Sequence, residues 1–470
     1  MFSFLYHIIN FQRLSIYTWF KYKVTGNIEL ELIKRCKSEI IQSGFVTIKL
    51  CQWSLPRLNL LYDLEREEWF KELEKIYDSC YIHDKNYTKE IYNLTTGTNF
   101  DDKYILKDVV ASGSIGQVYR IKDKETGEIK ALKCKHPGTN FQYRLSMCII
   151  RGMSFFLTSI KRIHYRIFPV DLETFFESLY AQVYLSNEAA NLQKMYDNFK
   201  DTDRVVIPKL YDYNDDMIIM EYIEGIKYDN LDIPQNHRYK ICFLLYLTLR
   251  QMVLIDNTLH GDLHKGNWKV ILDHSSKTIK YKIVLYDMGY CFNVQHGLEI
   301  LESVEQNNVD KLSEIMPYTS TDVYNRPINE RKQIIKTELQ GELIRPVANK
   351  NIINNILGVG KKHGFILNGH FLSIGIIIEQ TSSIFDEFLI NKDAELKNEK
   401  ITDVDRIYKD IIVKKDYPDI IAFCQTYKCF PKLITYYENL VNEQENDRTG
   451  IFEGCDFSDL IDVSTAIMED

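Results

Sequence analysis

The spacing of apolar residues predicts helices in the first hundred residues of the chain. In ELELIKRCKSEIIQSG (29–44), apolar residues recur at helical spacing, and Gly44 is a typical helix stop signal. The stretch YDLEREEWFKELEKIY (62–77) repeats this pattern. We therefore predict an N-terminal helical extension over residues 1–100.

β-type runs follow this extension. The segment VYRIKDKETGEIKALKC (118–134) contains two such runs, and Gly127 between them suits a hairpin turn. The segment VVIPKLYDYNDDMIIMEYIEG (205–225) predicts a second hairpin. Between the hairpins, residues 141–200 have helical character. We therefore predict a β-rich unit with a helical insertion over residues 101–225.

The remaining residues, 226–470, have a mainly helical pattern. It is interrupted by HGDLHKGNWKVILDHSSKTIKYKIVLYDMG (260–289), which predicts the order loop, strand, turn, strand, loop. Strands therefore cluster early in the chain, helices dominate late, and one pair of polar loops lies between them. This order predicts an α+β fold.

Composition and charge exclude some partners and compartments. The 470 residues are 45% hydrophobic and 26% charged, as in ordinary globular proteins. The formal net charge of -8 argues against a nucleic-acid partner, because proteins that bind phosphate backbones usually carry a basic excess. The ten cysteines form no CxxC pair, which predicts an intracellular reducing compartment. No stretch of about 18 residues lacks charge, so we expect no transmembrane helix.

The first 28 residues contain three basic residues and no acidic one, a partial match to a mitochondrial targeting segment. Arginine and serine are sparse here, whereas targeting segments are rich in both. The alternative interpretation is a buried aromatic helix, and the sequence leaves the compartment open.

Phosphoryl transfer requires donors around the phosphates, a cation, metal ligands and a base near the acceptor hydroxyl. The stretch ASGSIGQV (111–118) lies between β-type runs, and Gly113 and Gly116 allow backbone N–H groups to approach a phosphate closely. On its own this stretch fits a glycine-bearing hairpin better. The interpretation as a phosphate-binding loop depends on finding the cation, the metal ligands and the base elsewhere in the chain.

Lys133 is the candidate cation, because it lies in the apolar run ALKC, and buried lysines usually have a partner. Lys135 is the competing residue, since side chains two apart on a strand share a face. Glu188, beside the small Ala189 and Ala190, is the candidate partner on a helix that permits close packing. A solvated helix face is the alternative for Glu188.

Asp262 and Asn267 have the spacing D-x-x-x-x-N, in which the Asp accepts a proton from the substrate and the Asn holds a metal ion. Asp287, in LYDMG, then occupies the position of a second metal ligand. A zinc pair formed by His260 and His264 is the rival interpretation. The glycines in this stretch disfavour the helix that such a pair needs.

Five stretches together resemble the UbiB-like (activity of bc-one complex type) atypical kinase family, which is linked to coenzyme Q biosynthesis. They are SIGQVYR, ALKCKHPG, EAAN at 188–191, HGDLHKGN and LYDMG. The resemblance implies a protein-kinase-like bilobal fold with a small β-rich N-lobe and a large helical C-lobe. It also implies that Lys49 and Gln52, in IKLCQW, belong to a regulatory extension over the cleft.

The resemblance implies ATP and Mg²⁺ as cofactors. It implies that Lys133 contacts the phosphates, Glu188 orients Lys133, Asp262 activates the attacking group, and Asn267 and Asp287 bind Mg²⁺. The ATP-binding residues would be Lys133, the hinge residues Glu221 and Tyr222, and the loop residues Val110, Ala111, Ser112, Gly113, Ser114, Ile115, Gly116, Gln117 and Val118.

The implied function is that of a Mg-dependent ATP-binding kinase or ATPase. Because the extension would cover the place of a protein substrate, we expect a small or lipid-linked, quinone-pathway molecule as the substrate, with a membrane surface as a further partner. Two alternatives remain: a nucleotide-gated scaffold or lipid-binding pseudokinase without useful turnover, and a small-molecule kinase of the aminoglycoside type. The oligomeric state is not predicted.

The chain departs from the family pattern in three stretches. Gly113 stands where the family usually has Ala, Cys51 replaces a Gly between Lys49 and Gln52, and Gln182 and Tyr184 replace a Glu-x-Asp pair. Because Gly allows both signs of φ and a closer approach, we expect Gly113 to strengthen ATP binding.

Overall fold

A computed structural model provides the fold. The residues it describes are 2–62, 64, 67–78, 82–159, 173–233, 235–264, 266–273, 280–293, 296, 299, 303, 308–340, 349–374, 376–377, 417–426 and 428–447. Within these ranges, no helix combines the length and the apolar character that crossing a membrane requires.

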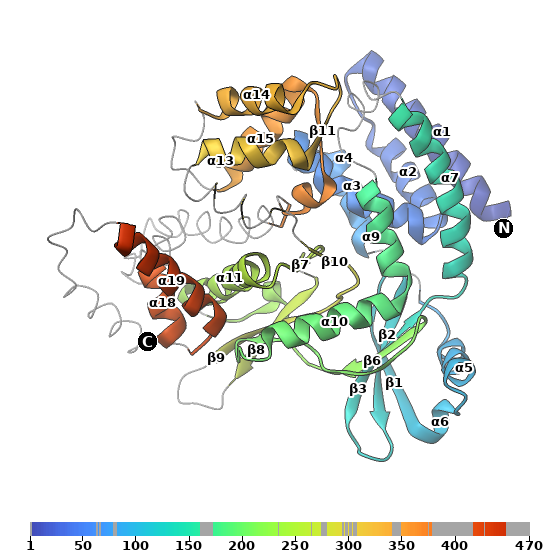
Figure 1. Cartoon of the computed structure of the whole chain (residues 1–470). Helices are drawn as coiled ribbons and strands as arrows, with labels where there is room; N and C mark the ends of the chain where they lie inside the picture. Colours follow the sequence, from blue (N-terminus) through green and yellow to red (C-terminus); the bar gives the residue numbers. More distant parts are fainter. Residues whose placement is uncertain are drawn as a thin grey trace, which may run out of the picture.

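Helices form the N-terminal extension, as the apolar spacing predicts (Figure 1). The helix before Gly44 ends at Gln42, and Gly44 has a φ of 83°, which confirms the predicted stop signal. The second predicted helix is shorter than its pattern and continues as a 3-10 turn. These elements are α1(Phe2–Thr25), α2(Leu30–Gln42), α3(Phe45–Tyr62), α4(Glu68–Glu74) and η1(Lys75–Asp78).

One face of α1 is buried and the other is exposed. Ile8 and Leu14 are buried, and Thr18 lies against Cys36 of α2. The exposed apolar residues on the other face are Tyr6, Ile9, Ile16, Tyr17, Phe20 and Val24. The interpretation as a buried aromatic helix is therefore right about the helix and wrong about the burial of this face.

A five-stranded antiparallel sheet of order β1-β2-β3-β6-β5 forms the small lobe. Both predicted hairpins are confirmed, and Gly127 adopts a φ of 74° in the turn of the first. Helices α5(Lys85–Thr96) and α6(Phe100–Lys103) contribute Tyr92 and Phe100 to the core of this lobe. The strands are β1(Tyr104–Ser112), β2(Gly116–Asp123), β3(Ile129–Lys135), β5(Leu210–Tyr213) and β6(Met217–Glu221).

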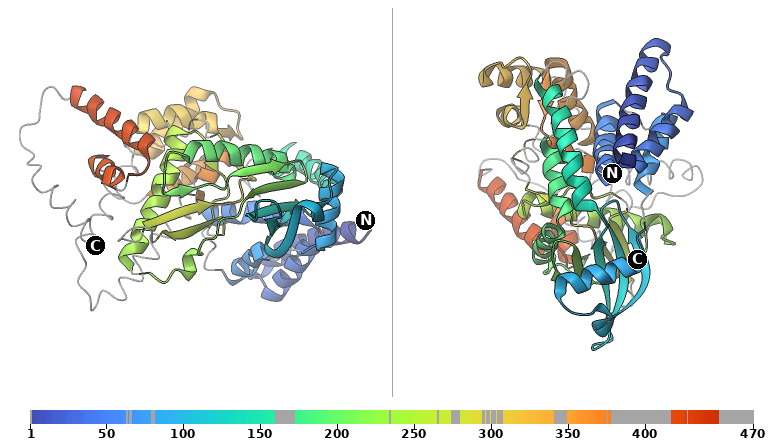
Figure 2. Two further views of the ribbon diagram at one scale, coloured as in Figure 1. Left: turned by 90° about the horizontal axis from the view of Figure 1, so that it is seen from below. Right: turned by 90° about the vertical axis from the view of Figure 1, so that its right-hand side faces the viewer.

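Three helices link the sheet to the rest of the molecule. They are α7(Thr139–Ser159), α9(Glu173–Val183) and α10(Leu185–Phe199). Helix α10 packs against β5 and β6 of the small lobe and also against β4(Val205–Val206), which pairs with a strand of the large lobe (Figure 2). A residue on α10 can therefore contact both lobes.

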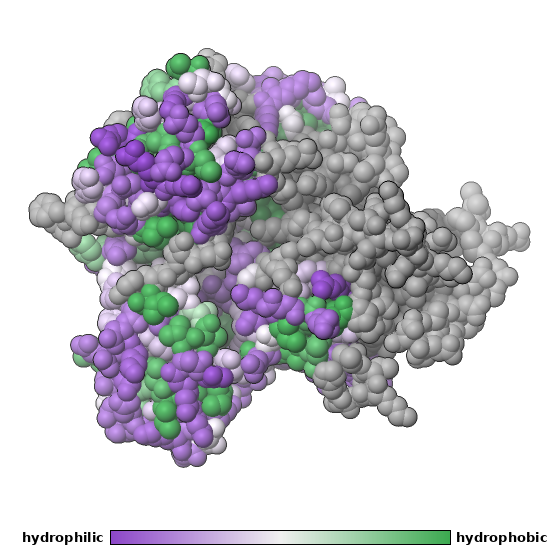
Figure 3. All heavy atoms as spheres, turned by 180° about the vertical axis from the view of Figure 1, so that it is seen from behind, coloured by the Kyte–Doolittle hydropathy of each residue, from purple (hydrophilic) through white to green (hydrophobic). Residues whose placement is uncertain are grey.

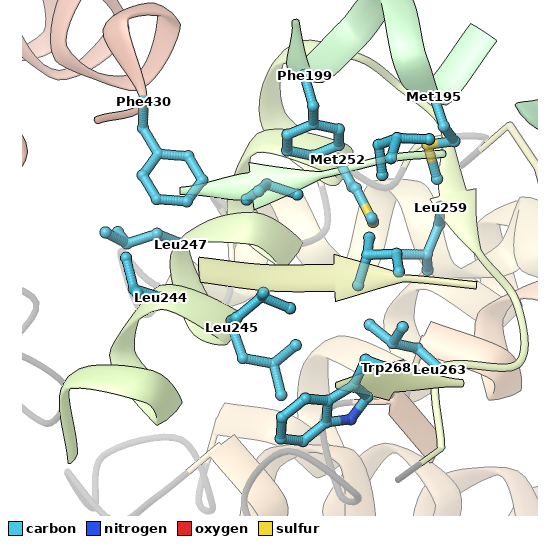
Figure 4. Packing of buried hydrophobic residues seen from close by; sticks show 14 of the residues in the cluster. Met195, Phe199, Leu244, Leu245, Leu247, Met252, Leu259, Leu263, Trp268 and Phe430 are labelled. Atoms are coloured by element: carbon cyan, nitrogen blue, oxygen red, sulfur yellow. The ribbon is translucent and has the colours of Figure 1, made fainter. Parts of the chain in front are cut away.

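The large lobe is built around α11(Gln235–Arg250) and two short sheets. Its largest core contains Trp268 together with leucines of α11, and Met195 and Phe199 of α10 (Figure 4). The predicted strands around the polar loops are confirmed as β8(Trp268–Asp273) and β9(Lys280–Leu285). The other elements of this core are η3(Gln251–Ile255), β7(Leu259–His260), β10(Cys291–Phe292), α18(Tyr417–Thr426) and α19(Pro431–Asp447).

A second group of helices caps the large lobe and contacts the extension. Helix α3 packs against α7, α9 and α15(Asn349–His363), and Arg57 of α3 donates a hydrogen bond of 2.6 Å to the Ser373 hydroxyl. The extension is thereby attached to both lobes. The remaining elements of this group are α13(Val309–Ile315), η4(Met316–Thr319), β11(Ser320–Asp322), α14(Ile328–Gln340) and β12(Phe365–Leu367).

Seen from behind, the small lobe carries hydrophobic side chains among hydrophilic ones on its surface (Figure 3). Ile105, Val109 and Val110 of β1 are among the exposed apolar residues of the molecule. Val110 is one of the predicted ATP-binding residues. It lies at the edge of the sheet because, among the described strands, β1 pairs with β2 alone.

Candidate nucleotide and metal site

Lys133 lies in the middle of β3, where it pairs with Val118 on one side and Ile218 on the other. Its ammonium donates to both carboxylate oxygens of Glu188 at 2.7 Å and to Asp287 Oδ1 at 2.9 Å. The Lys133 and Glu188 side chains are only 11% and 5% exposed, whereas Asp287 is 46% exposed. One buried cation thus joins two carboxylates that come from different lobes.

Burial and pairing set the charges in this cluster. Burial disfavours a charged Lys133, but Asp287 and Glu188 outweigh that effect and raise the lysine pKa. Burial raises the pKa of Glu188 to about 7, against the opposing effect of Lys133. Burial would also raise the pKa of Asp287, but Lys133 and then Lys49 hold it below its usual range. Lys133 and Asp287 are therefore charged at neutral pH.

The competing Lys135 lies outside this cluster. Its ammonium is 2.9 Å from Asp216 and 3.2 Å from Asn140 Oδ1, and its side chain is 3% exposed. It also approaches the ring of Tyr184, 5.6 Å from the centroid. Although Lys133 and Lys135 are two residues apart on one strand, only Lys133 contacts Glu188.

Helix α10 presents two functional side chains on one face, because residues three apart on a helix are neighbours. Glu188 binds Lys133, and Asn191 donates a 2.9 Å hydrogen bond to the backbone carbonyl of Met288. The residue after Asp287 is thereby attached to the same helix that orients Lys133. No role is predicted for Asn191 from the sequence. Its position in EAAN, three residues after Glu188, is the feature that places it on the same helix face as Glu188.

The loop from His260 to Asn267 is held by its own hydrogen bonds. The Asn267 side-chain amide donates to the Asp262 carbonyl at 2.8 Å, and the Tyr286 N–H donates to the Asn267 carbonyl at 2.9 Å. With its N–H₂ group used in this way, the Asn267 side-chain oxygen is left for a metal ion. Asp262 is 45% exposed and lies 3.9 Å from His264 Nε2. The loop therefore presents a partly exposed carboxylate beside an amide oxygen.

His260 connects the two polar loops rather than binding zinc. Its Nε2–H donates to the Tyr286 carbonyl at 3.0 Å, and its Nδ1 accepts the Asp262 N–H at 3.2 Å. Burial lowers its pKa, which agrees with a neutral ring that donates through one nitrogen and accepts through the other. Both ring nitrogens are thus used, which removes the zinc interpretation for this residue.

The segment after β9 is strained and tightly packed at Asp287. This residue has a φ of 55°, a left-handed conformation that costs a non-glycine residue roughly 1 kcal/mol. Gly289 follows two residues later, and a Cβ there would lie 3.2 Å from Asp287 Oδ1 and 3.4 Å from Glu188 Oε2. The glycine of LYDMG therefore allows the two carboxylates and the loop to approach one another.

The glycine loop forms a tight turn between β1 and β2. The Gly113 N–H donates to the Gly116 carbonyl at 2.9 Å. A Cβ at Gly116 would lie 2.8 Å from the Cys134 carbonyl oxygen, so only glycine fits against β3 there. At Gly113 a Cβ would meet nothing closer than the Gly116 oxygen at 3.6 Å, and φ is not positive. The described conformation therefore does not require glycine at position 113, and the expected effect of Gly113 on ATP binding stays a prediction.

The predicted nucleotide-loop side chains face different ways. Ile115 is buried in the core that α3 and α9 share, and the Gln117 side chain, which is fully buried, accepts the His83 N–H at 3.0 Å. Only the backbone of these two residues is available to a nucleotide. Ser112 and Ser114 are half-buried, and Ala111 and Gly113 are exposed.

The predicted hinge begins at Glu221, the last residue of β6, and continues into Tyr222. The Glu221 N–H donates to the Lys209 carbonyl at 2.8 Å, so the strand edge is paired at this position. The Tyr222 ring lies 5.6 Å from the Arg120 guanidinium. The Ile223 carbonyl accepts from the Tyr286 hydroxyl at 2.9 Å, which ties the hinge to the segment before Asp287.

The extension reaches the charged cluster through α3. Lys49 lies close enough to lower the pKa of both Asp287 and Glu188. Gln52 follows one helical turn later, on the same side of α3. Cys51 packs instead with Ile40, Ile48 and Ile76 of the extension core, and burial raises its thiol pKa to about 12.

The other departures from the family pattern have local partners. Gln182 donates to the Ser178 carbonyl at 3.2 Å, and its Cγ would lie 3.5 Å from a Cβ on Gly289. The Tyr184 ring lies tilted against Tyr180, with the ring centroids 5.2 Å apart, and faces Lys135. The chain thus has an amide near Gly289 and an aromatic ring beside Lys135 at these two positions.

The residues present fit Mg²⁺ and a nucleotide. The Asp287 carboxylate and the Asn267 amide oxygen are the hard oxygen donors that Mg²⁺ prefers. The half-exposed Asp287 remains reachable, and Lys133 supplies a fixed positive charge beside it. Among the described residues, no group of His, Cys, Asp and Glu forms a separate metal cluster.

These features define a protein-kinase-like bilobal fold, with a buried lysine–glutamate pair between the lobes and two polar loops beside it. A sequence model of the ABC1 atypical kinase-like domain matches residues 75–314, half of the chain. The chain belongs to this family, which confirms the resemblance to UbiB-like proteins.

Individual relatives agree with this assignment. The chain is 28% identical over 236 residues to a probable serine/threonine-protein kinase, abkC, of Dictyostelium discoideum, covering 49% of this chain and 34% of the relative. It is 28% identical over 252 residues to a probable protein kinase UbiB of Shewanella woodyi, covering 51% and 45%. The matched part thus spans less than half of each relative.

A solved structure from Mycobacterium tuberculosis, the complex of Rv3197 with erythromycin, is also similar. It covers 70% of this chain and 84% of its own, with 16% sequence identity and a TM-score of 0.42.

Proposed function

We propose that this protein binds Mg-ATP and transfers or hydrolyses its terminal phosphoryl group. The observation that carries the proposal is the contact of Lys133 with both Glu188 and Asp287, since kinase-type sites require this lysine–glutamate pair together with a metal-binding Asp. Mg²⁺, when bound, would neutralise charge on the phosphates and fix their position.

Each residue of the site would have a separate role in the reaction. Lys133, held by Glu188, binds phosphate oxygens, and Asn267 and Asp287 hold the metal ion. Asp262, which is half exposed, orients and deprotonates the acceptor hydroxyl or water. Its backbone carbonyl is fixed by Asn267, so the base and one metal ligand keep a constant relative position.

We propose a small or lipid-linked molecule as the acceptor, with water as the alternative. The support is the position of α3, which packs between α9 and α15 and brings the charge of Lys49 to Asp287 and Glu188. An extension in this place restricts access for a folded protein substrate. Quinone precursors are candidates because of the link between UbiB-like proteins and coenzyme Q.

We also propose that α1 binds an anionic membrane surface. Its exposed face carries Tyr6, Ile9, Ile16, Tyr17, Phe20 and Val24, with the exposed Arg13 on the same side. The helix has no acidic residue, although the whole chain has a net charge of -8. An apolar and aromatic face on a helix that carries basic residues and no acidic residue supports binding at an anionic membrane interface.

The test of the activity uses the full chain. Purified protein is mixed with Mg-ATP, with EDTA in a parallel sample, and phosphate release is measured with and without vesicles that contain quinone precursors. We expect Mg-dependent release that rises when vesicles are present. No Mg-dependent phosphate release under either condition would favour the alternative, a nucleotide-gated scaffold or lipid-binding pseudokinase without useful turnover.

The test of the membrane surface is separate from the activity. Phe20→Glu should reduce co-sedimentation with anionic vesicles several-fold, because it places a negative charge in the apolar face. Leu94→Glu on α5, which is also an exposed apolar position, is the matched control and should sediment like the original protein. Equal loss in both variants, or none in either, would contradict the role of α1.

A further inference from the structure

A chain of buried hydrogen bonds leads from α5 to the nucleotide loop. Its members are the Thr88 hydroxyl, the His83 ring, the His136 ring and the Gly113 carbonyl. The three contacts measure 2.8, 2.7 and 2.9 Å in that order. Thr88, His83 and His136 are 0%, 3% and 7% exposed, so water does not compete for these bonds. We call this chain the imidazole relay.

The direction of every bond in the relay follows from the acceptor at its end. A carbonyl oxygen only accepts, so His136 Nε2 carries a hydrogen and donates to Gly113. In a neutral ring His136 Nδ1 must then accept, and His83 Nδ1 is the donor to it. His83 Nε2 is left as an acceptor for the Thr88 hydroxyl. Only one arrangement of hydrogens satisfies all three contacts.

The surroundings keep both rings neutral. Burial and the neighbouring ring lower the pKa of His83 to about 4, against a small opposing effect of Asp84. Burial lowers the pKa of His136 as well. A second anchor is backbone: the His136 N–H donates to the Ile115 carbonyl at 2.8 Å. His136 therefore holds two carbonyls of the loop, one through its ring and one through its main chain.

The ring contact acts where the loop has most freedom. Gly113 lacks a Cβ, so the peptide plane between Gly113 and Ser114 can rotate more readily than its neighbours. In a trans peptide the C=O and the following N–H point in opposite directions. Holding the Gly113 carbonyl on His136 therefore also fixes the direction of the Ser114 N–H.

We propose that His83 is a positioning residue for nucleotide binding: by donating to His136, it holds the ring that fastens Gly113 and keeps the Ser114 N–H in one orientation for a phosphate. This inference rests on the proposed function. His83 touches no nucleotide and acts through His136. It lies ahead of α5, so the region before the small-lobe sheet takes part in the site.

The test compares two substitutions of His83 with a control on α5, the helix that follows it. His83→Phe fills the space without a donor, whereas His83→Asn keeps an N–H near the position of Nδ1. Asn93→Ala removes the bond from Phe100 N to Asn93 Oδ1 at the end of α5 without touching the relay. We measure the Mg-ATP dissociation constant, kcat, and amide hydrogen exchange over residues 112–118 without nucleotide.

His83→Phe should weaken Mg-ATP binding about five-fold, with kcat at saturation nearly unchanged, and should speed exchange in the loop. His83→Asn should recover most of the affinity and protection. Asn93→Ala should lower thermal stability while leaving affinity and loop exchange unchanged. A folded His83→Phe protein with the original exchange and affinity would overturn the inference.

A double-variant comparison separates the effect of the relay from a general loss of protein stability. His136→Gln keeps an N–H near the position of Nε2 for Gly113 but loses the ring contact with His83. Adding His83→Phe to it should change loop exchange and affinity by less than two-fold, because the effect of His83 passes through His136. An effect as large as in the original background would overturn the proposal, even if either single variant folds poorly.

The exchange measurement also separates this inference from the proposed function. If the original protein shows no Mg-ATP binding, the proposed function fails, and loop exchange in the His83 variants still decides whether the relay holds the loop. If the protein binds Mg-ATP and the His83 variants do not differ from it, only the relay fails.

Discussion

Besides Lys135, the end of β3 and the residue after it carry two side chains that can be positively charged, Lys133 and His136. Their surroundings have opposite effects on their charge. Lys133 is buried between two carboxylates, which keep it charged. His136 is buried between a second imidazole and a carbonyl, and both it and His83 are kept neutral. Burial is similar at the two places, and the partners decide the charge.

The difference assigns separate tasks to the two regions. A charge at Lys133 provides attraction for phosphates, and its partners Glu188 and Asp287 come from distant parts of the chain. A neutral His136 ring has one donor and one acceptor nitrogen, so its neighbours can fix its orientation. The ring in turn fixes the orientation of the Gly113 carbonyl. Loss of the positive charge at Lys133 should therefore abolish nucleotide binding. Loss of the fixed orientation of the His136 ring should only weaken it.

The largest effect is expected at the metal end of the charged cluster. Asp287→Asn should weaken Mg-dependent nucleotide binding by roughly 100-fold or more while the fold stays intact, because a neutral amide cannot replace a carboxylate on Mg²⁺. Thermal shift with Mg-ATP and with ATP in EDTA measures this. Asp216→Asn, which affects the partner of Lys135, is the control and should keep the full Mg-ATP shift.

Removing the cation itself should cost stability as well as binding. Lys133→Met leaves two carboxylates together without their counter-charge, which we expect to lower the free energy of unfolding by about 3 kcal/mol. Adding Glu188→Gln should restore part of this loss but not nucleotide binding. Denaturant unfolding measures the free energy of unfolding of both variants. A Lys133→Met protein as stable as the original would show that Lys133 does not neutralise the two carboxylates.

The two regions should also respond differently to acid. The folded pKa of His83 is about 4, below its usual 6.5, so His83 contributes stability above pH 6.5 that is lost as pH falls through about 4. The slope is at most roughly 1.4 kcal/mol per pH unit for one group. Glu188 behaves oppositely, because its raised pKa of about 7 makes it favour the folded state most at low pH.

Comparing the original protein with His83→Phe isolates the histidine contribution. The stability difference between them should shrink as pH falls from 7 to 4, measured by denaturant unfolding at each pH. A difference that stays constant over this range would show that His83 is not held neutral by the fold.

The extension should affect the charged cluster more weakly than its own members do. Lys49→Ala removes a charge that lowers the pKa of Asp287 and Glu188, so we expect ATP turnover to change several-fold. Lys34→Ala on α2, where the lysine is half exposed, is the control and should leave turnover unchanged. Equal turnover in all three proteins would place Lys49 outside the site's function.

The smallest effect is expected at Gly113. A Cβ fits there at 3.6 Å from its nearest neighbour, so Gly113→Ala should fold normally and weaken Mg-ATP binding by about 1 kcal/mol or less. Gly116→Ala, by contrast, puts a Cβ 2.8 Å from a backbone oxygen and should destabilise the small lobe. Tighter binding by the Gly113→Ala protein would mean that the loop closes over the phosphates differently from our proposal.

Local patterns were sufficient for the hairpins and for the order of the chemical groups. The β-type runs around Gly127 and the spacing of Asp262, Asn267 and Asp287 are properties of short segments, and such patterns depend on neighbours only a few residues away. The same applies to the choice of Glu188 as a candidate, since small residues beside it permit close packing.

Tertiary structure decided which of several equivalent residues meet. Strand alternation gives Lys133 and Lys135 the same face, and only the approach of α10 on one side and Asp216 on the other separates their partners. The exposed face of α1 likewise depends on what α2 covers, which an apolar aromatic sequence does not reveal.

The imidazole relay was decided entirely by the tertiary structure. His83 and His136 are 53 residues apart, and no spacing rule connects them or links either one to the carbonyl of Gly113. A histidine in a sequence can be charged, neutral, a donor or an acceptor, because its pKa lies near neutrality and its two nitrogens are interchangeable until partners are fixed. The sequence by itself determined that the loop has its glycines and that a histidine follows β3. Only the packing of α5 against the sheet removed water from both rings and made one tautomer of each the stable one.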